Sequence, residues 1–538
     1  MENLPEPDIQ AQTTLWQDVF CLAETIIRQT CQDSGTPGLA IGVFNRDAKL
    51  FDNYLGFRDV EKELPPDGCT VFNIGSMCKG FTALAIACLV TDGKLHWDDR
   101  VEHFLGNLRG AEVGNFTIRD FLSHRTGLCR SDALFVGSDN RLLLLKAQGT
   151  AVLTSLNAGC PPRQNFIYNN FGYHAVGCVI EKVSSMSYGD FLAQRIFKPL
   201  NMDRTFTDLP PILDMNIARA YVPYHNLKPR EVPTPRISSN TVAFAAGGIR
   251  SCLRDLLVFH GALLRVITTN TADPRLRIDP CDIHAIFDAV MPLHVPQSFR
   301  EQSYSMGWAR TQLPNQMSAI SGNSGVLDAY PTIGDWGKAP LVLHHGGNNL
   351  GCSSTMCMMP ELDVGIVVLG NSLGHCDATD WTAQILTEAY LWGTIKSPFR
   401  QYVNASAARG RTAMDRVQAM LDKEKKPSGP PGDLERYTGC FWHKSRQFCI
   451  VVELCERREL AMLLQGREDE KHSLRHYHHD TFVFNETFDQ VVDRGQWCRP
   501  HWFYKIEFVI QDGVADALRW RIDDTQEQGQ IFQRDNRC

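Results

Sequence analysis

A serine and a lysine stand three residues apart in Ser76-Met77-Cys78-Lys79, directly before the apolar run 81–90. At this spacing on a helix, the two side chains lie on the same face. A serine hydroxyl becomes a good nucleophile when a base takes its proton, and a buried amine with a lowered pKa can be that base. The pair therefore predicts nucleophilic catalysis by Ser76 with Lys79 as its neighbour.

Two later segments also carry polar groups suited to a catalytic cleft. Tyr168-Asn169-Asn170 lies between aromatic residues and an apolar helix, a pattern typical of a loop that delivers side chains to a site. Taken alone, Tyr168 is equally consistent with a core aromatic residue. The segment His344-His345-Gly346-Gly347 follows an apolar strand and forms the third group.

In this order the three segments resemble the serine β-lactamase and penicillin-binding-protein superfamily, specifically its class C, esterase and transacylase branch. Within this branch, the chain resembles members of the fungal polyketide acyltransferase type. The matching triplets are Ser76-x-x-Lys79, Tyr168-x-Asn170 and His344-x-Gly346. Further matches over roughly residues 35–375 are the segments 121–128, 246–251 and 306–308.

The resemblance implies a role for each residue. Ser76 attacks an acyl carbonyl, and Lys79 and Tyr168 share its proton, the buried ammonium lowering the pKa of the phenol. Asn170 anchors the Lys79 amine or a substrate carbonyl. The oxyanion is bound by the backbone N–H groups of Ser76 and Gly347.

In the triplet His344-x-Gly346, His344 stands where true β-lactamases carry a lysine that helps to hold a substrate carboxylate. A histidine at this place is similar to what esterases and acyltransferases of the superfamily carry. The deacylating glutamate of class A enzymes is not identified in the sequence. We therefore expect no antibiotic hydrolysis.

The pattern of apolar residues predicts an α/β (α+β) fold in two domains. Residues 1–404 should form a catalytic domain in which an antiparallel sheet is flanked by helices, with a mostly helical subdomain inserted at approximately 80–300. The meander 341–345, 352–359 and 364–370 is its clearest part. A polar, Pro/Gly-rich linker is expected at 405–432, and a small all-β barrel or sandwich at 433–538.

Other histidines invite further hypotheses. His124 could be a catalytic base, but a histidine at a helix end more often binds backbone carbonyls or caps the element. The tail holds His472, His476, His478 and His479 at spacings that match no zinc pattern, so a solvated strand and turn is favoured over a metal site. We expect no metal and no cofactor.

A net charge of −7 and a pI near 6.2 argue against nucleic acid as a partner. The sequence shows no signal peptide or membrane-spanning run, so we expect a cytoplasmic protein whose cysteines are reduced and which does not engage a membrane. The leading hypothesis is a serine hydrolase or acyltransferase that takes a small-molecule acyl donor and a water or alcohol acceptor, including transfer in secondary metabolism. The alternative is a catalytically silent scaffold or filament of the same fold.

Overall fold

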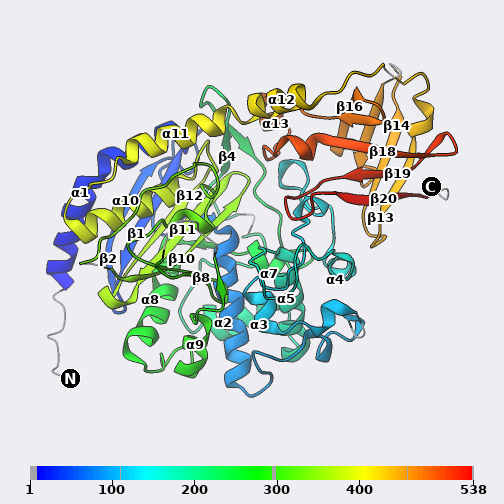
Figure 1. The fold of residues 1–538 in the computed structure, drawn as a ribbon. Coiled ribbons are helices and arrows are strands. Elements are labelled where there is room, and N and C mark those ends of the chain that lie inside the picture. The colour runs from blue at the N-terminus through cyan, green and yellow to red at the C-terminus, as the bar shows by residue number, and fades with distance from the viewer. Residues whose placement is uncertain are drawn as a thin grey trace.

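The large sheet, the helices around it and a separate barrel make up the architecture in Figure 1. This computed structural model describes residues 9–108, 111–211, 213–293, 299–337, 339–429, 431–456 and 459–535. The predicted fold class is confirmed: an antiparallel sheet flanked by helices, a mostly helical insertion and a C-terminal all-β barrel. Within the described ranges, no helix is both long and apolar enough to cross a membrane.

The sheet has eight strands in the order β2-β1-β12-β11-β10-β9-β8-β7. The predicted meander forms its centre, where nearly all residues of the three strands are buried. The strands are β1 (Gly38–Phe44), β2 (Lys49–Gly56), β7 (Met291–Pro292), β8 (Gln302–Tyr304), β9 (Ala309–Gln312), β10 (Leu341–Asn349), β11 (Cys352–Met359) and β12 (Val364–Gly370).

Alternate residues of each strand face opposite helical layers. Leu39 and Ile41 of β1 pack in one apolar cluster with the tryptophans of the outer helices, whereas Ala40 and Phe44 pack in the other. The outer layer contains α1 (Ile9–Ser34), α10 (Ala378–Trp392) and α11 (Phe399–Arg411). The inner layer contains α2 (Cys78–Thr91), α8 (Leu253–Thr269) and α9 (Pro280–Ile286).

The helical insertion surrounds α2, which is buried along nearly its whole length. A helix that is apolar on every side needs such an enclosure. The neighbouring helices are α3 (Ile118–Leu122), α4 (Lys146–Ser155), α5 (Asn170–Ser184), α6 (Tyr188–Leu192) and α7 (Phe244–Gly247). Two small strand pairs complete this region: β3 (Val71–Asn73) with β6 (Arg250–Cys252), and β4 (Ala220–Pro223) with β5 (Pro229–Val232).

The stretch 405–432, expected to be a linker, is mostly helical. It contains the end of α11 and the whole of α12 (Ala413–Glu424). The polar composition did not indicate this helix, although Met414, Val417 and Leu421 recur at helical spacing and are buried on one face. The extended part begins only at Lys425.

The tail closes into an eight-stranded antiparallel barrel, with β13 paired to β20. Its interior is filled by aromatic rings such as Tyr437, Phe482 and Phe508. A short helix, α13 (Phe488–Asp493), interrupts the strands. These are β13 (Gly439–His443), β14 (Cys449–Leu454), β15 (Leu460–Leu464), β16 (Lys471–His478), β17 (Thr481–Val483), β18 (Lys505–Gln511), β19 (Val514–Trp520) and β20 (Gln530–Asp535).

Buried hydrogen bonds join the barrel to the helical insertion. The Glu470 carboxylate accepts from the backbone N–H of Ser138 at 2.9 Å and from its hydroxyl at 3.0 Å. Asp523 accepts from the backbone N–H of Ser131 at 2.8 Å. Because such groups are costly to leave unpaired, the barrel is held in a fixed position against the catalytic part of the chain.

Replacing Glu470 with alanine should therefore destabilise the junction. The Ser138 groups would lose a charged acceptor in a buried setting, at a cost of about 2 kcal/mol. The measurement is the free energy of unfolding from urea denaturation of the full chain. Glu468→Ala is the matched control, since the Glu468 side chain is 76% exposed, and it should change stability by less than about 0.5 kcal/mol. Equal effects of the two substitutions would contradict the assignment.

Candidate active site

A tight turn presents Ser76 at the start of α2. The turn spans Gly75–Met77, and Gly75 has a left-handed φ of +50°. A Cβ at Gly75 would lie 2.8 Å from the backbone N of Asn348 on β10. Glycine therefore serves both the backbone conformation and the close approach of β10 to the nucleophile.

Lys79 is fully buried and directs its amine at three oxygens. Its Nζ lies 3.1 Å from Ser76 Oγ, 2.9 Å from Asn170 Oδ1 and 3.0 Å from the backbone oxygen of Ala246. Burial lowers the pKa of Lys79 to about 7. A neutral amine has two N–H donors, so it can serve Asn170 and Ala246 while its lone pair accepts the Ser76 hydroxyl proton. This is the arrangement that a general base requires.

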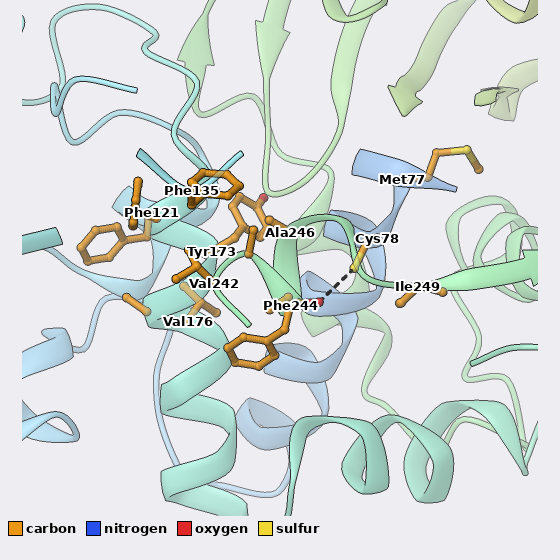
Figure 2. Close-up of a cluster of buried hydrophobic side chains, with 14 of the residues drawn as sticks. Met77, Cys78, Phe121, Phe135, Tyr173, Val176, Val242, Phe244, Ala246 and Ile249 are labelled. Atoms are coloured by element: carbon orange, nitrogen blue, oxygen red, sulfur yellow. Dashed lines mark hydrogen bonds between the residues drawn. The ribbon is translucent and has the colours of Figure 1, made fainter. Parts of the chain in front are cut away.

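Apolar packing fixes the position of the Ser76–Lys79 turn. Figure 2 shows Met77 and Cys78 at the start of α2. The Cys78 sulfur points to the backbone oxygen of Phe244, at a distance of 3.9 Å. Trp308 packs against Gly80, where a Cβ would lie 2.8 Å from the indole ring. Lys79 is thus enclosed by two of the segments noted in the sequence, 246–251 and 306–308.

Tyr168 lies beside Lys79, whose Nζ is 4.6 Å from the centre of the phenol ring. We expected the ammonium to depress the pKa of Tyr168, and this is wrong. Burial raises the pKa of the phenol, and a hydrogen bond with Ser76 opposes the rise only in part. A phenol that stays protonated can donate a proton, while the free lone pair belongs to Lys79.

Asn169 and His124 position the Tyr168–Asn170 loop. The Asn169 side chain caps α5 by accepting from the backbone N–H of Gly172 at 2.9 Å. The backbone N–H of Asn169 donates to His124 Nδ1 at 3.0 Å, and the His124 ring lies tilted against that of Tyr168, with 4.2 Å between the ring centres. Burial lowers the pKa of His124 well below its usual value. His124 thus accepts a backbone N–H in neutral form, a positioning role that differs from the expected binding of backbone carbonyls.

The two histidines of β10 point to opposite faces of the sheet. His344 lies on the outer face, where its Nε2 is 2.9 Å from the Thr311 hydroxyl, and its strand partner Cys357 contacts α10. His345 lies on the inner face, with its ring 6.3 Å from that of Tyr168. The expected placement of His344 at the site is therefore wrong, and His345 takes it. Adjacent histidines in a strand always diverge in this way, and the triplet alone did not identify the inward one.

His345 is held in place as a neutral side chain. Its Nε2 lies 3.0 Å from the Tyr304 hydroxyl, and burial, followed by the charge of Lys79, lowers its pKa to about 3.

The register of β10 also corrects the expected oxyanion donor. The β10–β11 hairpin closes through a two-residue loop, so Asn349 and Cys352 form its last hydrogen-bonded pair. Two residues earlier, Gly347 has the same orientation and directs its N–H at β11. The N–H of Asn348 instead points to the free edge, next to the Ser76 turn.

Gly346 and Gly347 allow this edge to approach closely. A Cβ at Gly347 would lie 2.0 Å from the backbone oxygen of Ile74, and one at Gly346 would lie 2.6 Å from that of Ile320. The two backbone N–H groups that can receive a developing oxyanion are those of Ser76 and Asn348.

A cavity of about 410 Å³ opens at Ser76. Sequence reasoning missed Asp132, whose Oδ2 accepts from Asn170 Nδ2 at 3.0 Å and extends the chain of hydrogen bonds from Lys79. It also missed Arg130, Trp497 and Arg499, which line the cavity. No motif marks these four residues, since their place depends on how distant segments meet. In the part of the chain that the structure describes, no group of histidines, cysteines and carboxylates is arranged to hold a metal.

Comparison with known proteins agrees with this fold. The Beta-lactamase family model matches residues 23–389, and a model named domain of unknown function, DUF3471, matches 423–534. The unguisins hydrolase ungD' of Aspergillus campestris is 24% identical over 82% of this chain and 79% of its own. The human serine beta-lactamase-like protein LACTB, mitochondrial, is 25% identical over 62% of this chain and 71% of its own.

Two solved structures share the fold. The octameric penicillin-binding protein homologue from Pyrococcus abyssi has a TM-score of 0.56 at 20% identity, over 95% of this chain and 99% of its own. The D-alanine carboxypeptidase AmpC from Burkholderia cenocepacia has a TM-score of 0.53 at 21% identity, over 69% of this chain and 98% of its own. Together with the family model, which covers more than half of the residues, they lead to one conclusion: the chain belongs to the beta-lactamase family.

Proposed function

We propose that the protein is a serine acyl hydrolase or acyltransferase that forms a covalent acyl-enzyme with an ester, thioester or amide. The observation that carries this proposal is the buried Lys79 amine, 3.1 Å from Ser76 Oγ and with a pKa near 7. Keeping an amine in an apolar setting is costly. A structural role would be served more cheaply by an apolar side chain.

In the proposed acylation step, neutral Lys79 takes the Ser76 proton as Oγ attacks the acyl carbonyl. The N–H groups of Ser76 and Asn348 stabilise the oxyanion. Tyr168, protonated and hydrogen-bonded to Ser76, donates its proton to the departing group and is reprotonated by Lys79. Asn170 and the Ala246 carbonyl hold the amine in line throughout.

Water or an alcohol then attacks the acyl-enzyme, with Lys79 again acting as base. Similarity to a fungal hydrolase favours hydrolysis, and transfer to an alcohol in secondary metabolism remains a proposal that rests on the family. A cytoplasmic location stays a prediction. The scaffold alternative requires no reactive serine, so covalent labelling separates it from the enzyme.

Ser76→Ala should abolish labelling by a fluorophosphonate and lower ester hydrolysis by about 10⁴-fold, because the nucleophile is removed. Mass spectrometry of the intact chain measures the adduct. Ser321→Ala is a matched control on the cavity wall and should retain labelling. A folded wild-type chain that is never labelled would favour the scaffold.

The rate of labelling should depend on pH through Lys79. The neutral amine is the active form, so the rate should rise as pH increases through about 7 and reach a plateau above about 8. Below pH 6 it should fall about tenfold per pH unit. Tyr168→Phe should be slower by roughly 10²- to 10⁴-fold but keep the same midpoint. If the rate keeps rising to pH 10 in the wild type but not in Tyr168→Phe, Tyr168 is the base.

Substituting the paired histidines separates the two faces of β10. His345→Gln should slow labelling at least about tenfold, because it disturbs the Tyr304–His345–Tyr168 contacts at the site. His344→Gln faces α10 and should stay within about threefold of wild type. Melting temperatures of both variants control for folding. The reverse order of effects would restore His344 as the site residue.

A further inference from the structure

The barrel contributes side chains to the cavity at Ser76. Trp497 and Arg499 lie in the segment between α13 and β18 of the barrel, and both line the cavity together with Ser76 and Tyr168. Arg130 and Asp132 from the helical insertion line the same cavity. A substrate bound at Ser76 therefore contacts both parts of the chain.

Arg499 brings to the cavity a positive charge that forms no ion pair with the described residues. Its backbone N–H donates to the Tyr504 hydroxyl at 3.1 Å, and its guanidinium lies 5.6 Å from the ring centre of Phe503. Among the described residues, no carboxylate lies within 4.0 Å of its side-chain nitrogens. Burial lowers the pKa of this arginine, and the charge of Asp132 opposes that shift from a greater distance. Arg499 is only partly exposed, so its guanidinium has lost hydration without gaining an ion pair, and a ligand would offset that cost.

Arg130 adds a second guanidinium to the same cavity. Its only ion pair in the described chain is with Asp524 of the barrel, at 3.8 Å, where the Asp524 side chain is 59% exposed. The Nε of Arg130 is buried and has no acceptor. Two arginines thus face one cavity carboxylate, Asp132, one oxygen of which is already bound by Asn170. Arginine donates in the planar, paired geometry that a carboxylate accepts.

We propose that Arg499, assisted by Arg130, binds a carboxylate group of the substrate, so that the barrel selects acidic acyl substrates. This inference rests on the proposed function of Ser76 and deepens that function by naming the chemical class of the substrate. Phe135 and Phe166 line the same cavity and provide apolar contact for the remainder of the molecule. The carboxylate could belong to the acyl group or to the leaving group, and matched esters separate these sources.

The kinetic test compares acid and neutral esters. Mono-4-nitrophenyl glutarate and its methyl ester place the charge on the acyl side, while 4-acetoxybenzoate and its methyl ester place it on the leaving group. In Arg499→Gln, the acid-over-neutral ratio of kcat/KM should fall about 10- to 100-fold for at least one pair, and Arg499→Lys should recover part of it. Arg519→Gln on the barrel surface, where Arg519 pairs with Glu507 at 3.1 Å, should leave both ratios unchanged.

A binding test does not depend on catalysis. Calorimetry should show that glutarate or 4-hydroxybenzoate binds the Ser76→Ala chain at least about tenfold more tightly than the Ser76→Ala, Arg499→Gln chain. Unchanged ratios and unchanged binding in folded variants would overturn the proposal, as would equal losses for acid and neutral esters. If Ser76 is not labelled by the fluorophosphonate and no ester is turned over, the proposed function fails, and this binding comparison still decides whether Arg499 recognises carboxylates.

Discussion

The burial of one amine governs the structure around the candidate site. Lys79 can be accommodated in an apolar helix only because Ser76, Asn170 and Ala246 supply oxygens at hydrogen-bond distance. Each of those partners comes from a different element, so the helix, the capped loop and α7 must meet at one point. Desolvation of the amine lowers its pKa and makes it a base near neutral pH. The desolvation that makes the buried Lys79 amine unfavourable for stability is thus also what would make it reactive.

The free edge of β10 is the second constraint. Pairing with β9 ends at His344, which leaves the next residues of β10 open toward the nucleophile turn. Glycines at 75, 346 and 347 remove the side chains that would hold the strand away. Backbone N–H groups can then face the position where negative charge develops, and they need no rearrangement during the reaction.

The sequence predicted the fold class and the Ser76, Lys79, Tyr168 and Asn170 cluster well, since helical spacing and strand patterns are local signals. Three errors came from non-local properties. The choice between His344 and His345 depends on which sheet face meets α2, and the raised pKa of Tyr168 depends on total burial. The place of Arg499 at the cavity depends on how the C-terminal barrel docks against the insertion, which no motif encodes.

Together these features describe a candidate active site assembled from the sheet edge, the helical insertion and the barrel. In the proposed reaction, Ser76 is the nucleophile and the N–H groups of Ser76 and Asn348 receive the oxyanion. A crystal structure of the fluorophosphonate adduct tests this most directly. It should show phosphorus bonded to Ser76 Oγ and one phosphonyl oxygen about 2.7–3.1 Å from both backbone nitrogens. An adduct on another residue, or an oxygen bound by Gly347 rather than Asn348, would contradict it.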